Sequence, residues 1–89
     1  MERVLTVGSV VYSRAGRDEG RYYIVTEIVS DGFVRIADGD VRRLDKAKLK
    51  KVKHIKITGD VIESVAEKIK TGAVVYDSEI REALRRYNS

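Results

Sequence analysis

Short runs of alternating hydrophobic and polar residues fill the first two thirds of the chain, and this alternation is typical of β-strands. In the last run, Ile55 and Ile57 fall on one face and His54 on the other. Five such short strands cannot bury their apolar faces in a flat sheet, so we expect a small closed or half-closed antiparallel barrel. The runs are Ser9–Arg14, Tyr22–Val29, Phe33–Ala37, Val41–Leu44 and Lys53–Ile57.

Two Asp-Gly pairs separate the central runs. Asp31-Gly32 lies between Tyr22–Val29 and Phe33–Ala37, and Asp38-Gly39 lies between Phe33–Ala37 and Val41–Leu44. Asp-Gly favours a two-residue type I′ turn, because both central residues of that turn need a positive φ, which Gly tolerates freely and Asp better than most residues. The three runs therefore predict an antiparallel meander.

After Thr58-Gly59 the hydrophobic period becomes that of a helix. Asp60 stands where an N-cap residue belongs, and Gly72 stands where a left-handed C′ residue ends a helix. The sequence therefore predicts a first helix between these two residues. Its apolar stripe is Val61, Ile62, Val65 and Ile69.

A second helix is predicted from Asp77-Ser78 onward, with Val74-Val75 as a hydrophobic staple at its entry. Helices of this length are marginal alone in water, so their stripes must pack on the barrel, on each other or on a partner. We expect a mainly β barrel domain over residues 1–57 and an extension of two short helices over residues 58–89. The second apolar stripe is Ile80, Ala83, Leu84 and Tyr87.

Charge is distributed unevenly along the 89 residues, whose net charge is +4. Residues 1–56 hold thirteen Lys and Arg against eight Asp and Glu, whereas residues 57–89 hold five against six. The first part is therefore the candidate for an anionic partner. Its most basic stretch, residues 42–56, interleaves eight basic residues and one acid with Leu44, Leu49, Val52, Ile55 and Ile57. Such interleaving indicates charge mounted on a folded surface, and the alternative is a solvated lysine-rich face.

Composition argues against several other classes of protein. Because the chain has no cysteine, it has neither a disulfide framework nor a thiolate metal site, in keeping with a reducing cytoplasm. No run approaches the ~20 apolar residues of a membrane span, and the N-terminus has no signal-peptide pattern. A single histidine without a nucleophile–base pattern predicts neither a catalytic centre nor a metal site. We expect a cytoplasmic protein that is not an enzyme and uses no cofactor.

The segment Val7–Asp38, VGSVVYSRAGRDEGRYYIVTEIVSDGFVRIAD, resembles a KOW motif, in which a strand is followed by a glycine-bearing basic loop and a second β-rich strand. The ordered trio AGRDEG, ADGDVRRL and KLKKVKH is similar to one branch of that family, the archaeal and eukaryotic large-subunit ribosomal protein called "fourteen-e" and its small bacterial relatives. The resemblance covers residues 7–57. The chain departs from the family's pattern at Ala47 and Val52, where relatives usually carry proline.

This resemblance implies an SH3-like barrel that binds structured RNA, most often ribosomal RNA, with ribosomal proteins as neighbours of the helical tail and no membrane partner. The residues support RNA contact independently, because Gly16 and Gly20 let the loop turn tightly and bring backbone N–H groups near a phosphate. Arginine's planar fork suits phosphate oxygens and guanine edges. The expected RNA-binding residues are Arg14, Gly16, Arg17, Gly20, Arg21, Arg42, Arg43, Lys46, Lys48, Lys50, Lys51, Lys53, His54 and Lys56.

Other interpretations stay open at this point. The loop containing Gly16 and Gly20 is alternatively an ordinary hairpin loop with solubilising charges. Tyr22 and Tyr23 point to opposite faces of a strand, so one joins the core while the other stacks on an exposed base, or both pack half-buried; Tyr12 has the same alternatives. The second functional hypothesis is a protein-interaction module of the transcription or translation machinery, which docks through the barrel and the amphipathic tail.

Overall fold

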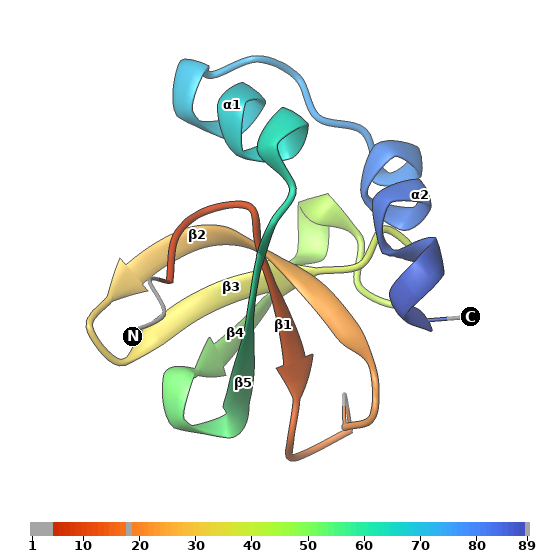
Figure 1. Cartoon of the computed structure of the whole chain (residues 1–89). Helices are drawn as coiled ribbons and strands as arrows, with labels where there is room; N and C mark the ends of the chain where they lie inside the picture. The colour runs from red at the N-terminus through yellow and green to blue at the C-terminus, as the bar shows by residue number, and fades with distance from the viewer. Residues whose placement is uncertain (1–4, 18, 89) are drawn as a thin grey trace.

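A computed structural model of the chain describes residues 5–17 and 19–88. In this part of the chain, five strands form one antiparallel sheet in the order β4-β3-β2-β1-β5, and the helices α1 and α2 lie on one side of it (Figure 1). The protein is therefore mainly β, as the sequence predicts. The elements are β1 (Ser9–Ser13), β2 (Tyr22–Ser30), β3 (Phe33–Ala37), β4 (Lys48–Lys51), β5 (Ile55–Val61), α1 (Glu63–Thr71) and α2 (Asp77–Asn88).

One face of the curved sheet encloses a hydrophobic core. Because side chains alternate along a strand, Val11 of β1 and Tyr23 of β2 both point to this face. Leu5, Val52 and Ile57 pack against its margin. The buried members of this core are Val11, Tyr23, Val25, Val34, Ile36 and Ile55.

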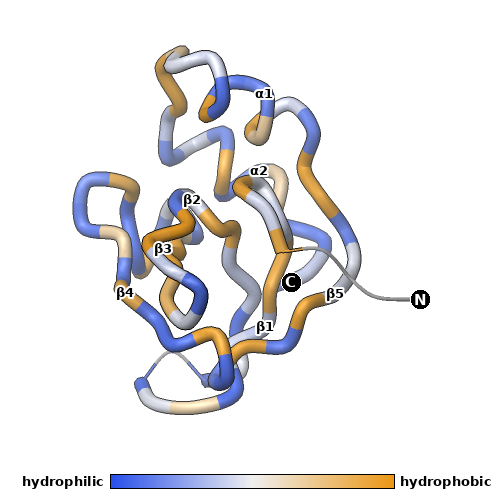
Figure 2. Tube along the Cα trace, turned by 90° about the vertical axis from the view of Figure 1, so that its left-hand side faces the viewer, coloured by the Kyte–Doolittle hydropathy of each residue, from blue (hydrophilic) through white to orange (hydrophobic). Residues whose placement is uncertain are grey.

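The opposite face of the sheet carries a second core beneath the two helices. Val10 and Ile24, which alternate with the residues of the first core, meet Val65 of α1 and Ile80 and Leu84 of α2. The tube in Figure 2 shows how hydrophobic segments of strands and helices alternate with hydrophilic ones around the molecule. The apolar stripes of both helices are thus buried on the sheet. Of the three alternatives for these stripes, packing on the strands is the one observed. The residues packed around this core are Tyr22, Leu44, Ile62, Ile69, Val75, Ala83 and Tyr87.

The turn between β2 and β3 lies at Asp31-Gly32, where the sequence predicts it, but its type differs from the prediction. No non-glycine residue in the described ranges has a positive φ, and Gly32 is not among the glycines that do. The turn is therefore not type I′. The β2–β3 pairing also shifts register between Ile28 and Ser30, beside the turn.

The predicted strand Val41–Leu44 is wrong. Asp38 is buried, and its carboxylate accepts hydrogen bonds from the backbone N–H groups of Asp40 (3.0 Å) and Arg42 (2.8 Å), which draws the chain into a compact turn. A 3-10 turn, Leu44–Lys46, follows. The strand that pairs with β3 is the lysine-rich segment Lys48–Lys51 instead.

The predicted strand Lys53–Ile57 is displaced along the chain. Residues Val52–His54 form a 3-10 turn between β4 and β5, and β5 then continues to Val61. Gly59, with φ of 93°, lies where the β1–β5 pairing is irregular. Asp60 consequently belongs to a strand and accepts a hydrogen bond from the Tyr87 hydroxyl (2.6 Å) instead of capping a helix.

The helix ends follow the sequence more closely. Gly72 terminates α1 in the left-handed conformation with φ of 78°, and α2 begins at Asp77. Both were predicted, whereas α1 begins at Glu63, later than expected. No helix among the described residues is long and apolar enough to cross a membrane.

Candidate nucleic-acid interface

The loop after β1 and the strand β4 form a basic cleft, although they lie far apart in the sequence. The cleft has a volume of about 350 Å³. It brings together the two halves of the basic surface that the sequence suggests, the AGR loop and the KLKKVKH segment. The residues that line it are Gly16, Arg17, Lys48, Leu49, Lys50, Lys51 and His54.

Backbone and side-chain hydrogen bonds hold the loop against β4 and the turn that follows it. The Arg14 N–H donates to the His54 carbonyl (2.8 Å), and the Lys50 ammonium donates to the Ala15 carbonyl (2.7 Å). Gly16, with φ of 79°, leaves room for that ammonium, since a Cβ there would lie 3.3 Å from the Lys50 Nζ. The fold therefore sets the position of the loop backbone.

Lys50 requires a correction to the expected set of RNA contacts. Only 7% of its surface is exposed, because it pairs with Val34 of β3 and points its side chain toward the loop. A buried ammonium needs an acceptor, and the Ala15 carbonyl provides one. Lys50 thus anchors the loop, while its neighbours in sequence face solvent.

The cations at the rim of the cleft are uncompensated. Arg17, Lys48 and Lys51 are exposed, and none has a hydrogen-bond or ion-pair partner within residues 5–17 and 19–88. Lys53, also exposed, and half-buried His54 follow in the adjoining turn. Like charges held together without counter-charges create a local positive potential that attracts an anion.

The far end of the loop, at Gly20, forms the turn that closes the loop and does not line the cleft. Gly20 has φ of 92°, and its N–H donates to the Ser13 carbonyl (3.1 Å), which closes the loop. The exposed Glu19 is the described acid of the loop. Asp18, which belongs to the same motif, lies outside the described residues.

Arg21 also requires a correction. Its guanidinium donates from Nε (3.1 Å) and Nη2 (2.9 Å) to one oxygen of Asp38, whose side chain is fully buried. Asp40 lies within 3.9 Å of the same group. The charge of Arg21 is therefore compensated inside the protein, and its side chain is held against the turn that follows β3.

The remaining cations of the basic stretch lie away from the cleft. Arg42, Arg43 and Lys46 line a separate hollow of about 360 Å³ together with two acids, Asp40 and Asp45. This region is tied to α2. The sequence does not distinguish these cations from those of the cleft. Leu49, which the interleaved pattern suggests is buried, is 43% exposed in the cleft.

Lys56 lies in a third place, beside the tyrosines. Tyr23 is fully buried in the first core, whereas Tyr22 is half-buried on the opposite face, with its ring centroid 5.0 Å from that of Tyr12. Tyr87 of α2 continues the row, 5.3 Å from Tyr22. Sequence reasoning missed the contact of Tyr87 with the Tyr22 ring, because the helical spacing of Tyr87 indicates only a core position.

Among the described residues, no group of three or more His, Cys, Asp or Glu side chains is placed to hold a metal ion. Comparison with models of known protein families gives no match to this chain, and comparison with curated proteins gives none either. The assignment of function therefore depends on the geometry of the cleft and on the motifs of the sequence.

Proposed function

We propose that this protein is an RNA-binding protein whose ligand is folded ribosomal RNA, and that it acts in the cytoplasm in or beside the large ribosomal subunit. It binds rather than catalyses. The observation that carries this proposal is the basic cleft, in which Arg17, Lys48 and Lys51 present charges that no described side chain compensates. Phosphate contacts of this kind supply most of the affinity of proteins for nucleic acids.

We also propose that the sheet is an SH3-like barrel of the KOW type. Two features support this assignment. Strands β1 to β4 pair in sequence order while β5 returns to β1, and a single 3-10 turn, Val52–His54, connects the two edge strands β4 and β5. Gly16 and Arg17 of the AGRDEG motif, which carries the resemblance to the "fourteen-e" family, line the cleft.

The shape of the cleft favours contacts with the phosphate backbone of an RNA over the enclosure of a ligand in a deep pocket. The cations belong to a strand and to a loop whose backbone is fixed by Lys50 and by the Arg14–His54 hydrogen bond. A loop backbone that is already held in place loses little conformational freedom on binding, which favours a partner with regularly spaced charges. Folded RNA presents such an array of phosphates.

Protein docking through the amphipathic tail has less support. The apolar stripes of α1 and α2 are buried against β1 and β2, so neither helix offers a free stripe to a groove. Among the described residues that expose large apolar side chains, Ile28, Val29 and Phe33 lie together near the β2–β3 turn. They lie on a hairpin and carry no motif of their own.

The test compares two variants that each lose one arginine and one lysine. In the cleft variant, Arg17→Gln/Lys51→Gln, two fewer cations face the phosphates, which weakens binding to total ribosomal RNA about tenfold at moderate salt. The control variant, Lys70→Gln/Arg85→Gln, removes exposed cations of the helices and should bind as the wild type does. Equal binding of all three proteins would contradict the proposed surface.

Co-sedimentation separates ribosomal residence from general affinity for RNA. The wild-type protein should sediment with large ribosomal subunits and be released by a high-salt wash, while the cleft variant should stay in the supernatant. Failure of the wild-type protein to sediment with the subunits would refute the ribosomal part of the proposal, and sedimentation of the cleft variant at the wild-type level would refute the role of the cleft in it.

A further inference from the structure

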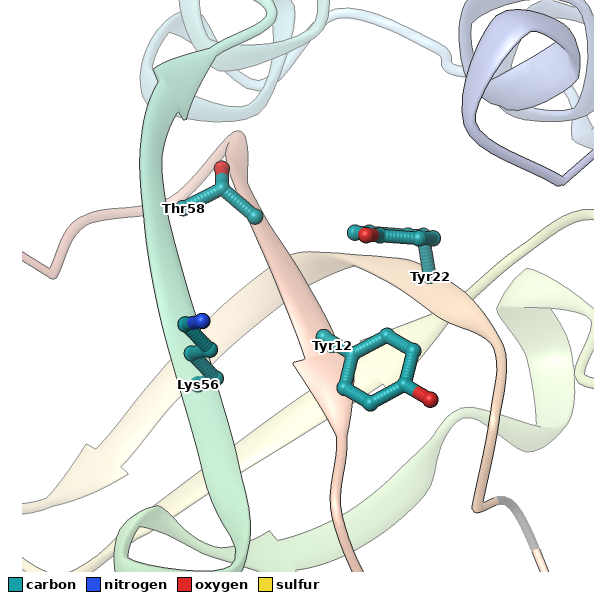
Figure 3. Close-up of a pocket in the computed structure, with 4 residues that line it drawn as sticks. All are labelled: Tyr12, Tyr22, Lys56 and Thr58. Carbon is teal, nitrogen blue, oxygen red and sulfur yellow. The ribbon is translucent and has the colours of Figure 1, made fainter.

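A row of three side chains crosses the sheet outside the basic cleft. Tyr12 of β1 is the register partner of both Tyr22 of β2 and Lys56 of β5, so all three project from the same face on adjacent strands. Neighbouring strands lie about 4.8 Å apart, which sets the spacing of the row. Figure 3 shows Tyr12 between the other two, with Thr58 above them.

These side chains line a hollow of about 480 Å³ with Thr58. This volume falls within the usual range for small-ligand sites of roughly 300–1,000 Å³. The Tyr12 and Tyr22 rings are inclined at 60°, so each offers a different wall. Within the described residues, the Lys56 ammonium has neither a hydrogen-bond nor an ion-pair partner.

The helix α2 fixes this platform at the Tyr22 end of the row. Asn88 accepts a hydrogen bond from the Tyr22 N–H (2.8 Å) and donates one to the Tyr22 carbonyl (3.1 Å), which clamps the start of β2. Tyr87 packs against the Tyr22 ring, and its hydroxyl donates to Asp60. A platform held in this way loses little entropy when a flat ligand stacks on it, and aromatic rings are the usual stacking surface for bases.

The platform adjoins the basic cleft along the β1–β5 pairing. Tyr12 pairs with Lys56, and two residues away, just after β1 and just before β5, the Arg14 N–H donates to the His54 carbonyl. Two residues of a strand span about 7 Å. Because His54 lines the cleft, the cleft and the tyrosine row lie within the reach of one extended polyanion.

We propose that Tyr12, Tyr22 and Lys56 form a site for one unpaired nucleotide, with its base stacked on the Tyr12 ring, its edge against Tyr22 and its phosphate on Lys56. This inference rests on the proposed function, and it adds the class of RNA. The protein then prefers an RNA in which a duplex borders unpaired bases, because bases within a duplex already stack on each other and are not free for the platform. The lysine and the continuity with the cleft favour a nucleotide over a peptide.

The test uses two RNA probes with the same duplex stem. One is a hairpin with a loop of adenosines, of which one is replaced by the fluorescent base 2-aminopurine, and the other is a blunt duplex. Wild-type protein should bind the hairpin more tightly and quench the fluorescence of its loop. Tyr12→Leu should bind the hairpin about tenfold more weakly and lose the quenching, with unchanged affinity for the duplex. Tyr12→Phe, which keeps the ring, should retain both.

The controls are matched in residue type. Tyr76→Leu removes an exposed tyrosine of the α1–α2 linker and should behave as wild type. Lys56→Gln should weaken hairpin binding several-fold, and Lys70→Gln should not. Because Lys56 is exposed, its substitution tests the site even if Tyr12→Leu fails to fold.

The outcomes separate the two proposals. If Arg17→Gln/Lys51→Gln weakens binding of both probes while Tyr12→Leu and Lys56→Gln weaken neither, the nucleotide site is refuted and the cleft stands. If the cleft variant weakens binding of neither probe, the proposed RNA surface itself is refuted. Equal wild-type affinity for hairpin and duplex, without quenching, also overturns the nucleotide site and leaves the tyrosines to a protein partner.

Discussion

Two regions of this protein contain clustered basic residues, yet they use their charge differently. In the turn after β3, Arg21 is paired with the buried Asp38, and Arg81 of α2 donates to the Gly39 carbonyl (3.0 Å). In the cleft, Arg17, Lys48 and Lys51 lack partners among the described side chains. The first region uses cations to hold the turn and α2 in place, and the second leaves them available to an anion.

We therefore select the candidate binding surface by the absence of internal compensation among its described cations, and not by the number of cations. A paired and partly buried guanidinium has already exchanged its water for a carboxylate, so an incoming phosphate would have to displace an internal partner. An exposed, unpaired lysine has no such competitor. Substitutions in the turn should therefore change stability, and those in the cleft should change binding.

The largest expected effect is at Gly39 in the turn. This residue has φ of +77°, and a Cβ there would lie 2.1 Å from the Asp77 carbonyl oxygen at the start of α2. Gly39→Ala should lower the free energy of unfolding by about 3 kcal/mol, because backbone strain adds to overlap with another backbone. Urea denaturation measures this decrease in the free energy of unfolding. The control Gly20→Ala, with φ of +92° but no atom within 4 Å, should cost about 1 kcal/mol.

The next effect is at Asp38. Asp38→Asn places an amide beside the Arg21 guanidinium, and one of the acceptors in that contact becomes a donor. We expect the unfolding free energy to fall by about 2 kcal/mol, since a buried carboxylate that binds a cation and two backbone N–H groups is replaced. Asp45→Asn, at an exposed acid, should change the stability by less than about 0.5 kcal/mol. Similar values for the two variants would contradict the structural role of Asp38.

Two adjacent lysines sharpen the comparison within β4. Lys50→Met keeps the aliphatic stem but removes the shorter of the two hydrogen bonds to the Ala15 carbonyl, the other coming from the Ser13 hydroxyl (3.3 Å), so we expect about 1 kcal/mol lower stability. Lys51→Met should leave stability within about 0.5 kcal/mol and lower RNA affinity. Thermal melting and filter binding of both variants provide the measurement. An equal decrease in stability for the two would mean that Lys50 does not anchor the loop.

The smallest effect concerns the contact between the two helices. The Lys68 ammonium, which donates to the Glu79 carboxylate, holds the pKa of Glu79 below its ordinary value of 4.5. Because the folded-state pKa is lowered, the contact stabilises the fold above pH 4.5, and this contribution disappears as the pH falls through the folded-state pKa. Glu79→Gln should flatten the acid limb of a stability–pH curve. The exposed Glu67→Gln serves as control, and an equal flattening there would refute the assignment.

Much of the fold follows from local patterns. The strands at residues 9–13, 22–30 and 33–37 and both helix stripes were predicted, because alternation and helical period report directly which face is buried. The prediction of a strand at Val41–Leu44 failed because the buried Asp38 captures the backbone N–H groups that a strand would offer to its neighbour. That capture depends on Arg21 and α2, which no local pattern includes.

The candidate site was predicted in outline but not in detail. The AGR loop and the lysine-rich segment do meet in one cleft, yet the pattern did not separate buried Lys50 from exposed Lys51. Strand alternation alone predicts that Lys50 and Lys51 point to opposite faces of β4. Which of the two faces is buried depends on where the loop closes. The tyrosine row depends on pairing across three strands and on α2, so it became visible only in the folded protein.

Salt dependence tests the central claim most directly. The slope of log K against log salt for RNA binding changes by about 0.7–0.9 for each phosphate that the protein no longer neutralises. The cleft variant Arg17→Gln/Lys51→Gln should therefore bind with a slope shallower than wild type by about 1.5, while the equally charged control Lys70→Gln/Arg85→Gln should keep the wild-type slope. Identical slopes for all three proteins would contradict the assignment of the cleft as the RNA-binding surface.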